Sequence, residues 1–182
     1  VARIVEDRDA SPEEKKVTLC NTGLYCVDGT RLAQWIEQID NKNAQGEFYL
    51  TDIVDSAARA HAQTVALRIT DATEIAGANS RADLAILEHA VQNRLRHAAM
   101  EGGVTLSDPD TVYFSWDTKT GRDVCIGQNV VFGPGVEICD NAEILPFCHI
   151  EGAQIASGAR IGPFARLRPG TQIGAQAHIG NF

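Results

Sequence analysis

The last third of the chain, residues 124–182, repeats an aliphatic or aromatic residue every six positions. With a single five-residue step, the series consists of Ile126, Phe132, Ile138, Ile144, Ile150, Ile155, Ile161, Leu167, Ile173 and Ile179. A small or β-branched residue stands two positions before each of them, from Val124 to Ala177. Such a short period excludes helix pairs and propeller blades and is typical of a parallel β-helix, in which each hexapeptide supplies one strand and one corner.

In such a coil, the periodic residues point inward and stack on those of the coils above and below. Glycines in the spacers would serve corners that need unusual backbone angles. Ordinary antiparallel strands joined by glycine turns are the alternative, but they do not require ten core positions in phase. We therefore predict a column of aliphatic side chains as the core of this region.

Composition narrows the range of partners. The chain has 182 residues, of which 44% are hydrophobic, and this suffices for one large or two small domains. The net charge is −8, with nearly all the acidic excess before residue 124, and no basic stripe carries interleaved aromatics. We therefore expect no nucleic acid partner. We also expect no membrane partner, because neither a signal peptide nor a long apolar run is present.

The cysteine count is odd and no pair has the spacing of a redox or zinc motif. The five residues are Cys20, Cys26, Cys125, Cys139 and Cys148. We expect buried free thiols rather than a disulfide framework or a zinc site.

The first 123 residues read as a mixed α/β region followed by one long helix. Apolar patterns predict strands at 1–6, 17–20 and 65–69 and helices at 30–39 and 53–61, with Thr51 or Asp52 as the second N-cap. The long helix begins after Ser80, with Asp83 completing a capping box, and ends at 102–103. We expect it to be a rigid strut between two domains.

Five motifs, taken together, resemble one enzyme family along the whole chain. In order they are Ile4-Val5-Glu6, Asn21-Thr22-Gly23, NAQGEFYLTD at 43–52, Gly77-Ala78-Asn79 and IGPFARLRPG at 161–170. They are similar to the bacterial bifunctional N-acetylglucosamine-1-phosphate uridyltransferase/glucosamine-1-phosphate acetyltransferases.

The resemblance implies three parts. Residues 1–81 would be the C-terminal part of a Rossmann-like uridyltransferase domain, 82–102 a linker helix, and 103–182 the start of a left-handed β-helix acetyltransferase domain. The family enzyme is a cytoplasmic homotrimer that makes UDP-N-acetylglucosamine for the cell wall and lipopolysaccharide. It transfers acetyl from acetyl-CoA to glucosamine-1-phosphate, and then uridylyl from UTP to N-acetylglucosamine-1-phosphate with Mg²⁺, releasing pyrophosphate.

Site residues follow from the same resemblance. Glu6 and Asn21 match residues of the sugar pocket, where a carboxylate and an amide suit sugar hydroxyls and an N-acetyl group. Tyr49 and Thr51 match residues that line this pocket. Asn79 matches the asparagine that contacts the nucleotide sugar and holds Mg²⁺ through its side-chain oxygen.

In the β-helix, Arg168 matches the arginine that binds the sugar phosphate, for which a guanidinium has suitable geometry and permanent charge. Arg166 is interpreted as a solvated arginine of the coil surface. His149 and His178 do not match the family's catalytic histidine and are expected to be surface or inter-coil residues.

The resemblance assigns no catalytic residue to this chain. The family's glycine-rich loop and metal-binding aspartate would precede Val1, and its acetyltransferase lysine, histidine, tyrosine and coenzyme A contacts would follow Phe182. We therefore expect the chain alone to catalyse neither reaction. Three alternatives are another sugar-phosphate nucleotidyltransferase, a trimerising β-helix module, and a γ-carbonic-anhydrase-like zinc enzyme, for which the histidines are too few.

Overall fold

The structure is a computed structural model that describes residues 1–181, so Phe182, the last residue of the predicted β-helix domain, lies outside the described residues. The chain forms two compact units, Val1–Ile75 and Ala76–Phe182. Each unit is described by itself.

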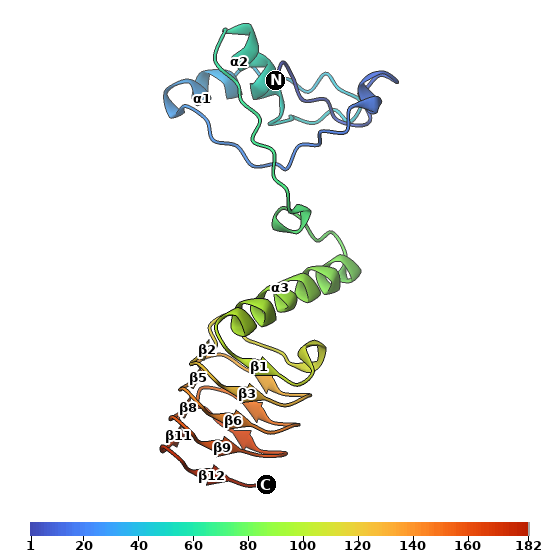
Figure 1. Ribbon diagram of the computed structural model, residues 1–182. Coiled ribbons are helices and arrows are strands. Elements are labelled where there is room, and N and C mark those ends of the chain that lie inside the picture. The colour runs from blue at the N-terminus through green and yellow to red at the C-terminus, as the bar shows by residue number, and fades with distance from the viewer. Residues whose placement is uncertain (182) are drawn as a thin grey trace. The chain divides into compact units, whose positions relative to one another are not determined.

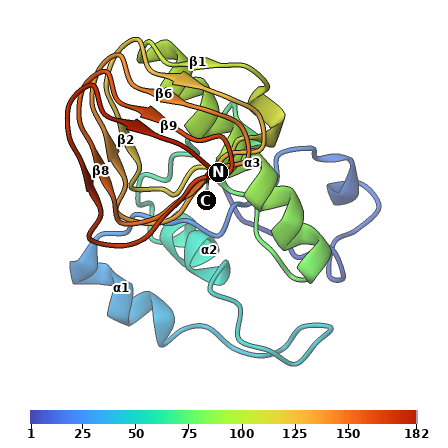
Figure 2. The ribbon, with the colours of Figure 1, turned by 90° about the horizontal axis from the view of Figure 1, so that it is seen from below.

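Most of the second unit is a parallel β-solenoid (Figure 1). Successive strands belong to three different sheets, so that every third strand returns to the same sheet directly below its predecessor, as with Ile126 and its partner Ile144. With β1 (Thr105–Leu106) and β2 (Lys119–Thr120) in the first coil, the sheets have the orders β1-β3-β6-β9-β12, β4-β7-β10 and β2-β5-β8-β11. Figure 2 shows the coils superimposed end-on. After the first coil, the strands are β3 (Cys125–Ile126), β4 (Val131–Phe132), β5 (Glu137–Ile138), β6 (Glu143–Ile144), β7 (His149–Ile150), β8 (Gln154–Ile155), β9 (Arg160–Ile161), β10 (Arg166–Leu167), β11 (Gln172–Ile173) and β12 (His178–Ile179).

The predicted aliphatic column is confirmed. Each periodic residue is the second residue of a two-residue strand and points inward; those from Ile126 to Leu167 are buried, and Ile173 and Ile179 pack against them partly buried. The small residues two positions earlier are buried as well from Val124 to Ala165. Alternation along each strand explains the pattern, because the residue between these two points outward.

The corners stack into columns of residues with positive φ, and glycine fills only one column completely. That column contains Gly135, Gly152 and Gly170; the others hold Asp123, Asn141, Gly158 and Gln176, and Asn129, Phe147 and Phe164. Backbone hydrogen bonds connect successive corners, for example Asn141 N–H to Arg122 O at 2.9 Å. Glycines lie at corners, as predicted, but phenylalanine was not predicted there. The rings of Phe147 and Phe164 stack with centroids 5.0 Å apart.

The first coil is less regular than those that follow it. It comprises β1 (Thr105–Leu106), a 3₁₀ turn η3 (Pro109–Thr111), an isolated bridge of Tyr113 to Val131, and β2 (Lys119–Thr120). The helix α3 (Arg81–Glu101) precedes this coil and contacts it. The predicted capping box is confirmed: Ser80 Oγ accepts from Asp83 N–H at 3.1 Å, and Asp83 Oδ2 accepts from Ser80 N–H at 2.9 Å. Within residues 1–181, no helix is long and apolar enough to cross a membrane.

The first unit contains two short helices around a small core. These are α1 (Gly29–Ile36) and α2 (Asp52–Arg59), and the buried residues are Trp35, Ile53, Val54 and Ala57. Asp28 caps α1 by accepting from Thr30 N–H at 2.9 Å. The 3₁₀ turns η1 (Glu14–Lys16) and η2 (Ala72–Glu74) complete the regular structure of this unit. Both predicted helices are present, although each is shorter than expected.

The predicted strands at 1–6, 17–20 and 65–69 are wrong for this structure, because residues 1–75 contain no β-strand. Several of their apolar side chains are solvent-exposed, with Val65 at 76% and Leu67 at 89% exposure. A strand needs a neighbour that pairs its N–H and C=O groups. No segment among residues 1–75 supplies one, so these apolar segments form no strand here.

The prediction about cysteines is half right. All five are free thiols, but only Cys148 is buried, and Cys20, Cys26, Cys125 and Cys139 are exposed. Cys148 fills an inward position, and burial raises the pKa of its thiol. The space beside it is tight, since a Cβ at Gly162 would lie 2.4 Å from Cys148 Sγ. Cys125 occupies the outward position of β3. The prediction of buried thiols did not separate outward from inward positions of the repeat.

Candidate functional site

Two of the motif segments in the first unit lie against each other. Asp9 Oδ1 accepts from Ala44 N–H at 2.8 Å, and Arg8 donates to Gln45 Oε1 at 3.2 Å. These contacts hold the loop at 43–49 beside the segment at 4–9. Both segments were predicted to line one pocket, but the residues that join them were not predicted.

Of the predicted sugar-pocket residues, the structure brings Glu6 and Thr51 together. Thr51 Oγ1 donates to Glu6 Oε1 at 3.4 Å, and Thr51 is 7% exposed. Tyr49 is half-buried, and its hydroxyl accepts from Gln45 Nε2 at 2.9 Å. Asn21 is exposed and donates to the Tyr25 hydroxyl at 2.6 Å; within residues 1–75 no hydrogen bond links it to Glu6, Tyr49 or Thr51.

A carboxyl with a perturbed pKa adjoins this group. Burial, together with the nearby charges of Asp40, Asp55 and Glu6, raises the pKa of Asp52 above its ordinary value. Asp52 begins α2, where the helix dipole favours a negative charge, but burial and the acidic neighbours outweigh that effect. The ionised form of Asp52 therefore destabilises the first unit.

We expect Asp52→Asn to stabilise the first unit at neutral pH. A raised folded-state pKa means that the penalty appears as pH rises through that pKa, and is absent below the unfolded-state value of about 3.9. The denaturant midpoint, followed by fluorescence of buried Trp35 in a Trp116→Phe background, should rise at pH 7 and be unchanged near pH 3. Asp55→Asn relieves part of the same repulsion but also removes the ion pair with Arg59, so the midpoint should rise less than in Asp52→Asn. Equal effects of both changes at pH 7 would contradict the assignment.

In the second unit, Asn79 precedes the N-terminus of α3 with a fixed backbone. Its N–H donates to Asp83 Oδ2 at 3.1 Å, and hydrogen bonds from Ser80 and from Asn79 hold the pKa of Asp83 below its usual range. The Asn79 side chain is exposed, so its amide oxygen is accessible. It offers one hard oxygen ligand, as Mg²⁺ requires when phosphates and water complete its octahedron. Within residues 1–181 no three His, Cys, Asp or Glu side chains cluster to hold a metal ion.

Arg168 lies on the solenoid directly after β10, at the start of a tight turn. Its carbonyl accepts from both Thr171 Oγ1, at 2.7 Å, and Thr171 N–H, at 3.1 Å. The turn rests on the glycine column: a Cβ at Gly152 would lie 2.8 Å from Pro169 Cα, so only glycine allows this approach. The backbone that carries Arg168 is thus held from two sides, while its side chain is exposed.

Within residues 1–181, the guanidinium of Arg168 makes no hydrogen bond or ion pair. The outward-facing Arg166 is exposed on β10, and His149 and His178 are exposed at the outward positions of β7 and β12. The histidines are therefore surface residues, as predicted. The positive charge of Arg168 is therefore available to an anion at this surface.

Comparison with known proteins extends this picture. The family described as "Bacterial transferase hexapeptide (six repeats)" matches residues 117–152. The chain is 56% identical over 179 residues to "Bifunctional protein GlmU" of Paramagnetospirillum magneticum, an alignment that covers 98% of this chain and 40% of that protein. Proteins of the same name from Sphingopyxis alaskensis and Sinorhizobium medicae are 50% and 45% identical over 100% and 98% of this chain and 40% and 39% of their own lengths. The chain thus spans about 40% of the length of these curated relatives.

Proposed function

We propose, because this chain is homologous over nearly its whole length to part of the bifunctional GlmU proteins, that it contributes to the synthesis of UDP-N-acetylglucosamine. The reactions are those implied by the resemblance described above. Acetyl-CoA acetylates glucosamine-1-phosphate, and UTP then uridylylates N-acetylglucosamine-1-phosphate with Mg²⁺. The observation that carries the proposal is 56% identity across 98% of the chain.

The domain assignment is part of the proposal. Residues 1–81 belong to the uridyltransferase part, 82–102 to the linker, and 103–182 to a left-handed coil of the acetyltransferase part. In the longer protein, the apolar segments at 17–20 and 65–69 pair with further strands of a Rossmann-like sheet. Their exposed apolar side chains support this assignment, because exposed apolar surface favours a covering partner. Assembly as a homotrimer and a cytoplasmic location are proposed from the resemblance.

The site residues carry over as proposals with defined roles. Glu6, Asn21, Tyr49 and Thr51 contact the sugar in the uridyltransferase pocket. Asn79 contributes an oxygen to Mg²⁺, which neutralises charge on the triphosphate when it is bound. Arg168 binds the phosphate of glucosamine-1-phosphate, in agreement with its exposed guanidinium on a fixed turn. No catalytic residue is assigned, so we expect residues 1–182 by themselves to catalyse neither reaction.

A hybrid enzyme tests the proposal. The matching segment of the Paramagnetospirillum magneticum protein is replaced by this chain, and the unaltered enzyme is the control. We expect the hybrid to acetylate glucosamine-1-phosphate and to release pyrophosphate from UTP and N-acetylglucosamine-1-phosphate, within about tenfold of the control, since differences outside the reacting groups have small effects. A folded hybrid without either activity would disprove the proposal. Pyrophosphate release with glucose-1-phosphate in preference would instead favour another sugar-phosphate nucleotidyltransferase.

A further inference from the structure

The edge of the first coil that faces α3 forms hydrogen bonds with side chains of this helix. Their pattern is the one that a neighbouring strand would provide. In a parallel ladder, alternate residues of a strand bond to opposite neighbours. Tyr113 bonds to the coil below, because its N–H donates to Val130 O at 2.9 Å and its C=O accepts from Phe132 N–H at 2.8 Å. Val112 and Phe114 therefore direct their carbonyl groups the other way, toward α3.

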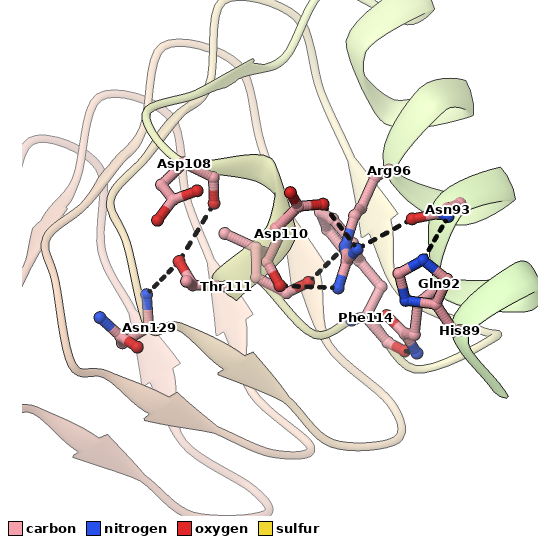
Figure 3. A network of polar contacts seen from close by, with 10 residues as sticks. His89, Gln92, Asn93, Arg96, Asp108, Asp110, Thr111, Phe114 and Asn129 are labelled. Carbon is pink, nitrogen blue, oxygen red and sulfur yellow. Dashed lines mark hydrogen bonds and ion pairs between the residues drawn. The ribbon is translucent and has the colours of Figure 1, made fainter. Parts of the chain in front are cut away.

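Gln92 replaces a strand neighbour for Phe114. Its side-chain oxygen accepts from Phe114 N–H at 2.9 Å, and its Nε2 donates to Phe114 O at 2.8 Å (Figure 3). The second Nε2 hydrogen is directed to Glu88 at 3.2 Å. Gln92 is 4% exposed, so the paired amide is shielded from water.

Arg96 likewise replaces a strand neighbour for Val112 and Asp110. It donates to Val112 O at 2.8 Å and to Asp110 O at 3.1 Å, and Asn93 Oδ1 accepts from it at 3.0 Å. The guanidinium also lies 5.7 Å from the centroid of the Tyr113 ring. Arg96 is 3% exposed, and a charge this deeply buried needs such partners. Figure 3 shows Arg96 of α3 linked to Asp110 of η3 and to Asn93, which in turn is linked to His89 one helical turn earlier.

The face is completed by apolar contacts. Leu95 and Ala99 pack against the core that begins at Val104, and with Gln92 and Arg96 they have the spacing of one helix face. All donors and acceptors directed to α3 from residues 110–114 thus have partners. An uncovered edge of this kind is a template for pairing with another chain.

We propose that the second half of α3 is the N-terminal cap of the solenoid, in which Gln92 and Arg96 take the place of a preceding coil and prevent the first coil from pairing with a second copy of this chain. The cap acts on the chain whatever reaction it serves. Buried Phe114 N–H and Val112 O would lose their partners if either side chain were removed, and an unmade bond at a buried site is costly. The segment at 110–116 would then open locally and offer its edge.

Amide hydrogen exchange and sedimentation of the full chain test this proposal in Gln92→Met, Arg96→Met and the milder Arg96→Lys. Arg81→Met is the matched control, because Arg81 is exposed on the first turn of the same helix. We expect Phe114 N–H to exchange at least about tenfold faster in Gln92→Met, with Gly133 and Leu145 unchanged. We also expect both methionine variants to form larger assemblies than the parent as concentration rises, with Arg96→Lys between them and the parent.

The control should match the parent in both measurements. Unchanged exchange of the Phe114 N–H would overturn the proposed cap, because Gln92 would then not protect the edge. Equal acceleration at every solenoid amide would also overturn it, because the side chains would then only stabilise the solenoid as a whole. An assembly mass that equals the parent's at all concentrations would overturn the protection against pairing. Faster exchange confined to residues 110–116 with growth in mass would support both parts of the proposal.

Discussion

Replacing Arg168 by glutamine in the hybrid enzyme is expected to reduce kcat/KM for glucosamine-1-phosphate by about a hundredfold, chiefly through KM. A charge-assisted, bidentate contact with phosphate contributes to binding in the ground state and the transition state alike, and a hundredfold corresponds to about 2.7 kcal/mol. The measurement is acetyl transfer from acetyl-CoA as a function of sugar-phosphate concentration. Arg168→Lys should retain part of the activity, because a lysine keeps the charge without the fork.

Arg166→Gln provides the matched control for this prediction. It removes the same charge two residues earlier, on β10, where the side chain is also exposed. We expect acetyl transfer to stay within about twofold of the parent, because an exposed surface charge has a small effect. Equal losses in both variants would show that general positive charge, and not a specific contact of Arg168, binds the phosphate.

Asn79→Ala in the hybrid should lower uridylyl transfer by on the order of a hundredfold while acetyl transfer stays unchanged. In the role proposed for Asn79, the change would remove an oxygen ligand of Mg²⁺ and a contact to the nucleotide sugar, and charge neutralisation by the metal carries much of the rate in such reactions. Part of the loss should be recovered at higher Mg²⁺ concentration. Pyrophosphate release measured across a series of Mg²⁺ concentrations checks both expectations.

Ser80→Ala separates this role from a structural one. It removes the hydroxyl that accepts from Asp83 N–H and should weaken the start of α3 by about 1 kcal/mol, but it leaves the Asn79 side chain intact. We expect uridylyl transfer to fall far less than in Asn79→Ala. If both variants lose the same activity, Asn79 acts by ordering the helix start and not as a ligand.

The solenoid and the start of α3 could be predicted because their signals are local or strictly periodic. The inward side chain of Ile144 stacks on the inward side chains of the neighbouring coils, such as that of Ile126. Each coil therefore needs an apolar residue at the same position. The capping box needs only Ser80 and Asp83, which are three positions apart. Such patterns do not depend on the rest of the fold, so they predict the coil or the helix start in any protein that contains it.

The buried face of α3 could not be predicted in this way. Leu84 and Val91 have helical spacing with Leu87, yet they are 59% and 44% exposed, whereas the polar residues Gln92 and Arg96 are buried. Apolar periodicity indicates a core face only when the surface that covers it is apolar. Here the covering surface includes a polar backbone edge, which requires donors and acceptors.

The candidate site shows the same division. Arg168 and Asn79 were nominated by the resemblance of the motifs at 161–170 and 77–79 to the enzyme family. The setting of Arg168 depends on a distant residue, because Gly152 supports the turn after it, and in the first unit Gln45 bonds to the distant Arg8. The raised pKa of Asp52 likewise depends on Glu6 and Asp40, which are far from it in sequence.

The sequence alone therefore determined the parallel coil, its inward column and the capped helix, since each arises from interactions that repeat or lie within one turn. Tertiary structure alone decided whether apolar segments such as 65–69 pair as strands and which face of α3 is buried. It also decided that the pKa of Asp52 is raised. These outcomes depend on hydrogen-bond partners and charges brought close by folding, and a partner distant in the chain leaves no local pattern by which to predict it.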